Sequence, residues 1–564
     1  MADSHSRMIR VPDPVHGYIP VEARFMDIVD TPEFQRLRSI EQGSFRPVFP
    51  GARHDRFLHS LGTYHLATIF AEHFFRNLKE DTGIRVDPAE EKMLRLTFRY
   101  AALLHDVGHA PFSHTTEDLF MDEKDARDIP VIWNALCREL EQVAPDSAPR
   151  FEKSTAEKQG AAHEIMSARI LLQHHSRFTG GARWKAPLPD PELAVRMIIG
   201  YTYSDADTDH AARDPDTIRK LGIRNCLIQL LNCSVLDVDR LDYLVRDTRM
   251  SGFVNAPLDL DTLARSVTAV EENGWLRPAF RSIAISAFET MYHAKLSHDA
   301  WVLAHPAGAY DAALRQHCIR SLDPSGCKPE DSYIRNVFCA DALGAQGVTF
   351  RGKTYRLLSD TDVAADLKAM SGAPFDELLT RAPGQRRTAV WNSYYEFRYL
   401  FTRPASGLTH TKVYDFFLPL IGYLERKHLF EFNPAVFQTM IDTPAGEIDE
   451  NARKAAVFLD TYLRKIRKNE DSEYSVVLMS RDLSFSVKLN LDELRIVFTK
   501  KSFPHRENVP NWTTFWQLRN LGGQPWERKK DHHHDGYFYL FRRGGLGSKQ
   551  LQILCDDLAA ALKN

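Results

Sequence analysis

The stretch HDVGHAPFSH, residues 105–114, places three histidines and one aspartate within ten positions. Residues 91–104 before it carry apolar side chains at three- and four-residue spacing, which predicts a helix with a wide buried face. Gly108 is the first residue that breaks this pattern, so we expect the helix to end near Asp106 or Val107. An aspartate beside a buried helix face is costly unless it is paired, and a metal ion or a salt bridge would remove that cost. The stretch leaves both readings open until partners are found elsewhere in the chain.

Two distant stretches could supply such partners. Residues 52–67 predict a helix that carries His59 on an early turn. Residues 232–247 predict an apolar helix in which Asp239 risks burial as a charge, and a buried charge demands a cation or a partner. A helical salt bridge with Arg240 or Arg246 is the alternative reading of Asp239.

Together, His59, His105, Asp106 and Asp239 offer two imidazoles and two carboxylates. Imidazole suits zinc, iron, manganese or cobalt, and carboxylate oxygens suit harder ions. Such a ligand set leaves positions open for water and for a substrate oxygen. The chemistry that it favours is metal-assisted hydrolysis of a phosphate bond.

The composition excludes several classes of protein. The chain has 564 residues, 43% of them hydrophobic, which is typical of a globular protein with two to four domains. The net charge of −3 shows no basic excess, so bulk attraction to nucleic acid is not indicated. No apolar run approaches the roughly 20 residues of a membrane span, and the N-terminus lacks an apolar signal core. Seven scattered cysteines fit a reducing cytoplasm, where thiols stay free.

The hydrophobic pattern changes along the chain, and we expect a mainly α protein with three parts. Residues 1–320 form a helical core, residues 321–470 a mostly helical extension, and residues 471–564 a smaller α+β module. Within the extension, residues 347–360 predict mixed elements. The histidine run at 529–536 favours an exposed turn over a metal site. In the last part, clusters of strand-forming residues lie at 472–479, 483–491, 494–500 and 536–543, and an amphipathic helix is predicted at 548–564.

The order His59, then His105 and Asp106, then Asp239 resembles the H…HD…D signature of the HD-domain metal-dependent phosphohydrolases. The sequence segments around these residues indicate a family more specifically than the four residues alone. It resembles the deoxynucleoside triphosphate (dNTP) triphosphohydrolases, in the branch that contains the SAM-and-HD-domain protein and its bacterial relatives, over about residues 8–320. The segments that carry this resemblance are DPVHGYIPV, DIVDTPEFQRLRSIEQ, VFPGARHDRFLHSLGTYHLA, LLHDVGHAPFSH and LDVDRLDYLVRD.

The resemblance implies an HD-domain helical bundle that hydrolyses a dNTP to the deoxynucleoside and inorganic triphosphate, with the four residues above as metal ligands. It places His109 beside the α-phosphate and His114 in the same catalytic group. It makes His163 the general acid on the leaving 5′-oxygen, with Glu164 as its neighbour and Glu117 as the carboxylate that orients it. These roles are chemically sensible, because a histidine near neutral pKa can donate a proton and a carboxylate can hold its tautomer.

The resemblance also implies a set of substrate-binding residues. Arg56, Arg240 and Tyr243 match positions that contact phosphates, a task that forked guanidinium donors suit. Gln42 and Asp247 match residues that contact the sugar 3′-hydroxyl. The full implied set is Gln42, Arg56, Arg240, Tyr243, Asp247, Lys295 and His305.

Several positions depart from the family pattern. Gly43 follows Gln42 where a leucine is usual, Leu303 stands in place of a sugar-stacking tyrosine, and Lys295 replaces an arginine. Pro12 replaces an asparagine before the DPVHG segment. Because these residues shape the sugar pocket and the allosteric interface, base and sugar preference stay open.

The residues that match a guanine-nucleotide allosteric site are Asp30, Gln35 and Arg38.

We therefore expect a cytoplasmic enzyme that uses a divalent transition metal (manganese, iron, cobalt or zinc), with magnesium at the phosphates. Its expected partners are a dNTP substrate, a nucleotide activator and further copies of the same chain, from dimer to hexamer. Nucleic acid is not indicated and no membrane is expected. Some bacterial relatives act in antiviral defence by depleting dNTPs. The alternatives are another HD phosphohydrolase (a phosphodiesterase, nuclease or nucleotide pyrophosphatase) and a nucleotide-sensing module with little catalysis.

Overall fold

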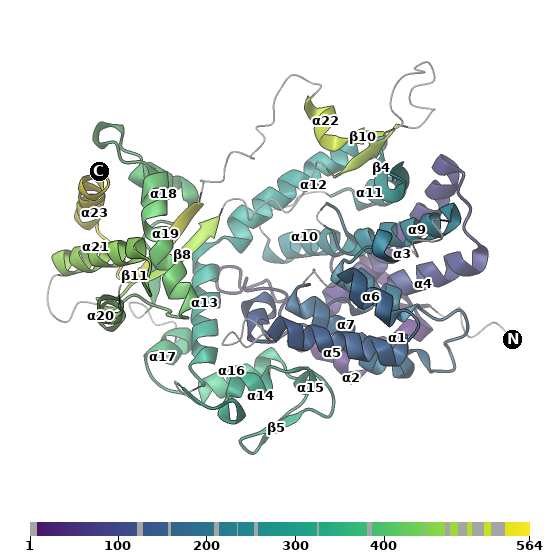
Figure 1. Cartoon of the computed structure of the whole chain (residues 1–564), viewed down its shortest axis with the longest axis horizontal. Helices are drawn as coiled ribbons and strands as arrows, with labels where there is room; N and C mark the ends of the chain where they lie inside the picture. Colours follow the sequence, from purple (N-terminus) through teal and green to yellow (C-terminus); the bar gives the residue numbers. More distant parts are fainter. Residues whose placement is uncertain are drawn as a thin grey trace.

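The structure is a computed structural model, and it confirms a mainly α protein with a smaller α+β part at the C-terminal end (Figure 1). Within the part of the chain that is described, no helix combines the length and apolar character needed to cross a membrane. The described residues are 8–120, 128–155, 160–207, 214–233, 235–252, 258–323, 326–380, 386–444, 446–467, 474–482, 493–498, 512–520 and 536–563.

The chain begins with an antiparallel hairpin of β1 (Met8–Asp13) and β2 (Gly17–Glu22), which the helical expectation for residues 1–320 had not included. Helix α1 (Ala23–Val29) follows. The predicted helix over 31–40 is instead one α turn, α2 (Pro32–Gln35), continued by a 3-10 helix (Arg36–Ser39).

Two long helices form the centre of the N-terminal region. Helix α3 (Arg56–Thr82) begins where the Asp55 side chain accepts the Leu58 N–H, and it ends at Gly83 in the left-handed conformation. Helix α4 (Pro88–Leu104) is capped by Asp87 and ends just before His105, close to the predicted end. Gly62 allows α3 to approach its neighbour closely, because a Cβ there would lie 1.9 Å from Asp242 Oδ1.

The helix predicted over 232–247 begins later in the structure, after a break that separates it from the helix before it. Helix α9 (Pro215–Leu231) ends at Asn232, and α10 (Val238–Ser251) starts after Asp237. The break forms because the extended Asp237 uses its carboxylate to accept the Arg240 N–H at 2.7 Å. Asp239 therefore lies in the first turn of a new helix.

The remaining helices of the N-terminal region pack around α3 and α4 (Figure 1). A second hairpin and a π-helical turn lie near its end. The bounds are α5 (Asp128–Val143), α6 (Ala148–Thr155), α7 (Ala162–Thr179), α8 (Pro191–Ile199), α11 (Leu260–Ser266), β3 (Val267–Glu272), β4 (Trp275–Arg281), α12 (Ile285–His298), the π-helical turn (Asp299–Leu303) and α13 (Pro306–Arg320).

Short helices and a small hairpin follow α13, in agreement with the mixed elements predicted for 347–360. A group of longer helices then leads to the C-terminal strands (Figure 1). The bounds are α14 (Tyr333–Val337), α15 (Ala340–Leu343), β5 (Val348–Phe350), β6 (Lys353–Tyr355), α16 (Asp360–Lys368), α17 (Ala373–Thr380), β7 (Arg387–Ala389), α18 (Tyr394–Phe401), α19 (His410–Arg426), α20 (Pro434–Asp442) and α21 (Glu450–Ile466).

The C-terminal strands belong to two different sheets. Strand β11 (Gly536–Arg543) is the centre of an antiparallel sheet between β7 and β8 (Val477–Asp482). Strand β9 (Arg495–Val497) pairs in parallel with β4 of the N-terminal region and antiparallel with β10 (Trp512–Thr514). The boundaries near 320 and 470 therefore remain predictions, and sheet pairing crosses both.

Two helices complete this end of the chain, α22 (Phe515–Asn520) and the predicted closing helix α23 (Ser548–Ala561). The predicted strand at 483–491 lies outside the described residues. So does the histidine run, except for the glycine that follows it at 536.

Candidate metal centre and active site

Four polar side chains from three distant segments meet in the N-terminal region. His59 lies on the first turns of α3, His105 and Asp106 follow α4, and Asp239 lies on the first turn of α10. His59 Nε2 is 2.9 Å from Asp239 Oδ1, and His105 Nε2 is 3.5 Å from the same oxygen. Asp106 lies 3.5 Å from each histidine Nε2, through one carboxylate oxygen each. These distances place the atoms around one common point.

The ring nitrogens at this point fit a bound cation. His59 Nε2 and His105 Nε2 are buried, and neither makes a hydrogen bond with any residue that the structure describes. Their other nitrogens are occupied, because His59 Nδ1 lies 2.8 Å from Asp242 and His105 Nδ1 lies 2.9 Å from the Ala102 carbonyl oxygen. Histidines that bind metals typically donate their second N–H in this way.

The charges of the surrounding side chains also favour a bound cation. Burial alone would lower the pKa of His59, but Asp239, Asp242 and Asp106 raise that pKa to about 10. Without a cation, several carboxylates thus surround two imidazoles deep in the protein. A divalent ion would neutralise this charge, and His59, His105, Asp106 and Asp239 would hold it.

Arg56 makes three hydrogen bonds beside the candidate metal centre. Its Nη1 donates to Asp106 Oδ2 at 2.8 Å, its Nε to Ser113 Oγ at 3.0 Å, and its Nη2 to the Gln42 carbonyl at 2.9 Å. Burial opposes the ionisation of Asp106, but Arg56, with His105 and His109, holds its pKa well below the usual range. Asp106 therefore forms a salt bridge, as one of the two interpretations of the HD dipeptide expected. It also lies among the residues that could bind a metal, as the other expected.

A buried ionic network that the sequence analysis did not identify supports His59. Asp242 contacts His59 Nδ1, lies 2.6 Å from His16 Nε2, and accepts two bonds from Arg246 at 2.7 and 3.0 Å. Arg246 also donates to Asp13 at 2.8 Å. These residues come from the DPVHG and DYLVRD segments, whose polar residues could have indicated this network.

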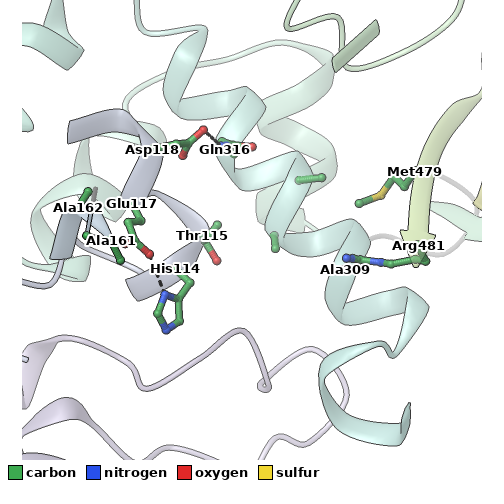
Figure 2. A pocket seen from close by; sticks show the side chains of 13 residues that line it. His114, Thr115, Glu117, Asp118, Ala161, Ala162, Ala309, Gln316, Met479 and Arg481 are labelled. Carbon is green, nitrogen blue, oxygen red and sulfur yellow. Dashed lines mark hydrogen bonds and ion pairs between the residues drawn. The ribbon is translucent and has the colours of Figure 1, made fainter. Parts of the chain in front are cut away.

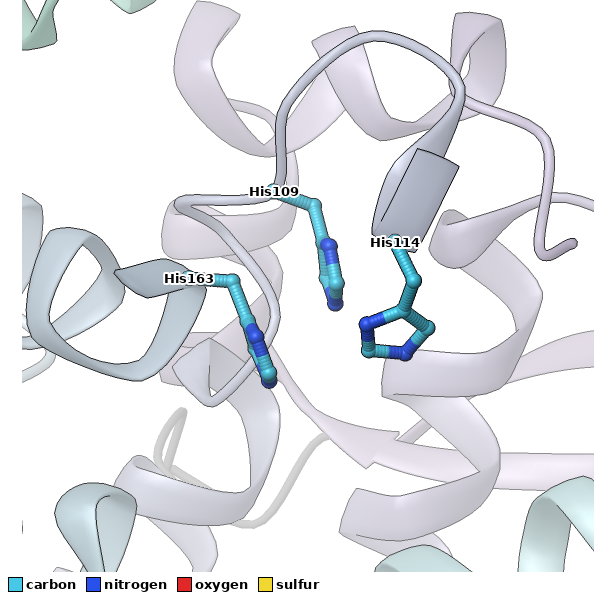
Figure 3. A group of neighbouring side chains, drawn as sticks. All are labelled: His109, His114 and His163. Atoms are coloured by element: carbon cyan, nitrogen blue, oxygen red, sulfur yellow. The ribbon is translucent and has the colours of Figure 1, made fainter. Parts of the chain in front are cut away.

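Three more histidines form a second group beside the metal centre (Figure 3). The rings of His109 and His163 stack with centroids 4.2 Å apart, and His114 meets His109 edge-on at 5.0 Å. Glu117 contacts the Nδ1 atoms of His163 and His114 at 2.5 and 2.8 Å. His109 Nε2 is 3.1 Å from Asp106 Oδ1, so this residue connects the two groups.

The three imidazoles differ in their preferred charge. Burial lowers the pKa of His163, but Glu117 more than offsets this and raises it. Burial and Arg56 lower the pKa of His109, whereas the His114 side chain is largely exposed. The stack of His109 and His163 is within 12° of parallel, so their lone pairs do not converge on one ion. This group is better suited to proton transfer than to metal binding.

Two cavities adjoin the histidines. The larger has a volume of about 480 Å³ and lies between the loop of His114, helix α13 and strand β8 (Figure 2). Ala309 and Gln316 of α13 and Arg481 of β8 line it. The smaller, about 20 Å³, is lined by His105, His163, Glu164, Asn232 and Asp239, and it has room for about one water molecule.

Among the implied sugar-binding residues, Asp247 lies in a buried polar cluster. It is 2.8 Å from His54 Nε2 and 3.3 Å from His298 Nε2, two contacts that the sequence analysis missed. The Gln42 N–H donates to the His54 carbonyl at 3.2 Å, and Gln42 Oε1 is buried without a hydrogen bond to any described residue. Phe45 stacks on His54 at 5.6 Å, and its Cζ lies 2.6 Å from where a Gly43 Cβ would be. Phe45 thus fills space beside Gly43.

The other implied substrate residues lie on nearby elements. Lys295 pairs with Asp299, and its Nζ lies 5.8 Å from the Tyr243 ring centre. Arg240 donates to the carbonyls of Val235 and Cys233 at 3.0 and 3.1 Å. His305 caps α13, because its Nδ1 accepts the Ala307 N–H at 3.2 Å. Part of the polar capacity of each residue is therefore used within the protein.

The implied allosteric residues are neighbours near the surface. Gln35 donates to the Val29 carbonyl at 2.7 Å, next to Asp30. Arg38 donates to Gln35 Oε1 at 2.8 Å, and its guanidinium lies 3.5 Å from the centre of the Phe57 ring. A nucleotide site at this corner stays a prediction.

Comparison with known proteins agrees with this geometry. The HD domain matches residues 56–178. The deoxynucleoside triphosphate triphosphohydrolase SAMHD1 of Danio rerio is 38% identical over 315 residues, 55% of this chain and 44% of that protein. An uncharacterised protein of Methanocaldococcus jannaschii is 27% identical over 321 residues, 57% of this chain and 51% of that protein. The chain thus spans about half the length of these relatives.

A hypothetical protein from Aquifex aeolicus shares the fold, with a TM-score of 0.52 over 98% of this chain and 100% of the other, at 16% identity. Human SAMHD1 is 42% identical over 110 residues, 19% of this chain and 16% of that protein. Residues 56–178 are thus similar to the HD domain, and the N-terminal region is similar to part of the deoxynucleoside triphosphate triphosphohydrolases named SAMHD1.

Proposed function

We propose that this protein is a metal-dependent phosphohydrolase that cleaves a dNTP into the deoxynucleoside and inorganic triphosphate. The observation that carries the proposal is the convergence of His59, His105, Asp106 and Asp239 around buried nitrogens that lack hydrogen bonds to the described residues. The second histidine group, joined to them through His109, supports hydrolysis rather than simple ion storage. The activity for which the SAMHD1 relatives are named supports the choice of substrate.

The four ligands would suit manganese, iron, cobalt or zinc, with magnesium reserved for the phosphates. A divalent ion bound there supplies Lewis acidity, which lowers the pKa of bound water and polarises a phosphoryl oxygen. The smaller cavity beside Glu164 and Asn232 offers room for one water molecule on this side of the site.

His163 is the general acid in this proposal. Glu117 holds its Nδ1, which leaves Nε2 to donate a proton to the leaving 5′-oxygen, and the same carboxylate favours the protonated ring. His109 favours the neutral form and would contact the α-phosphate. His114 shares Glu117 and completes the group, so that one carboxylate positions two catalytic rings.

Arg240, Tyr243 and Lys295 would bind the triphosphate, together with Arg56 at the α-phosphate. Gln42 and Asp247 would bind the sugar hydroxyl, and Asp247 is already oriented by His54 and His298. His305, on the far side of the π-helical turn, would border the nucleoside. We further propose activation by a guanine nucleotide at Asp30, Gln35 and Arg38 in a homo-oligomer.

A panel of dNTPs and NTPs, each with and without a second nucleotide, tests the proposal in the presence of manganese, cobalt or magnesium. Equal amounts of deoxynucleoside and inorganic triphosphate are the expected products. Nucleoside monophosphates or cleaved DNA would instead identify another HD phosphohydrolase. Nucleotide binding without turnover would identify a sensing module.

A further inference from the structure

A short segment outside the matched HD domain contacts both loops that carry active-site residues. Asp360, the first residue of α16, accepts the Phe112 N–H at 2.6 Å through Oδ1 and the Glu41 N–H at 2.8 Å through Oδ2. Phe112 lies between His109 and His114, and Glu41 precedes Gln42. One carboxylate from the extension therefore joins the loop of the catalytic histidines to the loop of a substrate residue.

Arg36 makes a second connection between the same parts. Its Nη1 donates to the Leu358 carbonyl at 2.7 Å, two residues before Asp360. Its Nη2 donates to the carbonyls of Val107 and His109 at 2.9 and 2.8 Å. The backbone of the HDVGH motif is thus fixed to the extension at both ends of the turn.

The histidine loop needs such support because its backbone is strained. Phe112 and Ser113 adopt φ values of 62° and 52°, a left-handed region that residues with a side chain rarely occupy. Such conformations cost about 1–3 kcal/mol each and persist only where surrounding contacts enforce them. The N–H of Phe112 is held by Asp360, and the Arg315 guanidinium lies 4.3 Å from the centre of its ring.

The ionised Asp360 carboxylate lowers the stability of the folded protein while it holds the two N–H groups. Burial, with a smaller contribution from Glu41, raises the pKa of this carboxyl from 3.8 to about 7, although Arg315 opposes the shift. Arg36 also faces it and stays charged. The folded protein thus holds the proton more tightly than the unfolded chain, and ionised Asp360 lowers stability as pH rises between about 4 and 7. A neutral asparagine would remove this charge but would keep only one of the two acceptors, because its Nδ2 donates hydrogen bonds.

We propose that Asp360 is a positioning residue of the active site, which sets the catalytic histidines against the Gln42 loop through the backbone of Phe112 and Glu41. It contacts no reacting group and acts only through these two N–H donors. The extension after residue 320 is then part of the catalytic unit. The proposal rests on the proposed function for its kinetic test, but its geometric content can be measured separately.

The variant Asp360→Asn tests the proposal, with Asp362→Asn as its matched control. Asp362 lies in the same helical turn, but its carboxylate accepts the Ser359 N–H and hydroxyl at 2.9 and 2.6 Å within its own helix cap. We expect Asp360→Asn to lower kcat by about 10- to 100-fold, since small misplacements of reacting groups have effects of this size. KM and bound metal should stay within about two-fold of wild type, and Asp362→Asn should leave kcat within about two-fold.

Thermal unfolding separates positioning from simple loss of structure. The Tm of Asp360→Asn, relative to wild type, should be higher at pH 8 than at pH 5, because the buried charge is removed. If the variant unfolds below the assay temperature, Asp360→Glu replaces it, since this change keeps the charge but displaces the carboxylate. The same loss of kcat is expected.

NMR of the histidine side chains gives a readout that needs no turnover. Asp360→Asn should shift the ring resonances of His114 and His163, and Asp362→Asn should not. If wild type hydrolyses a dNTP and Asp360→Asn matches it in kcat, the positioning role is wrong and the proposed function stands. If wild type hydrolyses no dNTP, the proposed function fails, and unchanged ring resonances would then overturn the positioning role as well.

Discussion

One hydrophobic core extends through the regions before and after residue 320, but the surroundings of the candidate metal centre in the first and of β11 in the second differ in chemistry. Around the metal centre, Asp242, Arg246 and His59 form a fully buried ionic network. In the C-terminal region, aromatic rings pack against β11, with Phe538 5.1 Å from Phe417 and 5.3 Å from Trp391. Buried ion pairs contribute little net stability, whereas buried aromatic surface contributes a great deal. The contrast suggests that the first region is organised around chemistry and the second around stability.

The largest expected effect comes from the metal ligands. Asp106→Ala removes a carboxylate that both histidines and Arg56 face, and it leaves Arg56 buried without its ion pair. We expect turnover to fall by more than about 1,000-fold, and bound metal, measured by mass spectrometry, to fall with it. His105→Ala should behave alike.

Asp261→Ala is the matched control for the first region, since its carboxylate pairs with Arg265 on the surface. It should leave both turnover and metal unchanged. Wild-type rates from Asp106→Ala would place the reactive centre elsewhere in the molecule and remove the basis of the comparison.

The proton-transfer group should have the next largest effect. His163→Ala should slow turnover by about 100- to 10,000-fold while bound metal is retained, because the ring lies outside the four proposed ligands. Loss of metal in this variant would instead make His163 a ligand.

Glu117→Gln sharpens the assignment through pH dependence. Glu117 raises the pKa of His163, so its removal should lower that pKa. Because a general acid must be protonated, the rate falls as pH rises through this pKa, and the fall should begin at lower pH in the variant. A profile of kcat against pH that does not move would exclude His163 as the acid.

The comparison also explains which features the sequence could predict. The H…HD…D residues could be found because each lies on or beside a strongly periodic helix, where a polar side chain on an apolar face is conspicuous. His54 and His298 were missed because Asp247, the carboxylate that both rings contact, is 193 and 51 residues away in sequence, and the segments around the two histidines do not indicate this contact.

The break between α9 and α10 depends on a single capping side chain, Asp237, inside a pattern that continues apolar on both sides. The pairing of β9 with β4 joins residues more than 200 positions apart, and strand pairing over such separations has no local signal. The contact of Asp360 with Phe112 is equally remote, at 248 residues. The sequence thus predicted the four residues that converge but not the contacts that position them.

A smaller effect is expected from the C-terminal side of the larger cavity. Arg481 lines this cavity with His114, and it makes no ion pair with any residue in the described ranges (Figure 2). In the proposed function, this guanidinium would attract the phosphates of a nucleotide that enters the cavity, so Arg481→Ala should raise KM by about 3- to 10-fold with little change in kcat. Initial rates over a range of dNTP concentrations measure both.

Arg403→Ala is the control in the same region, because Arg403 pairs with Asp556 at the surface, away from the cavity. Equal KM values for wild type and Arg481→Ala would mean that β8 closes the cavity without contacting the substrate. The second region would then contribute to the site only through Asp360.

The smallest effect on activity is expected in the aromatic core of the second region. Phe417 is 2% exposed and packs against Phe538 and Phe458. Phe417→Leu keeps an apolar side chain but leaves part of this space empty, at a cost of about 1–3 kcal/mol of unfolding free energy. The Tm should fall, whereas kcat/KM at a temperature well below the transition should stay within about two-fold of wild type. A loss of kcat/KM without partial unfolding would show that ring packing in the second region is coupled to the histidines of the first, and the division of labour between the two regions would then be wrong.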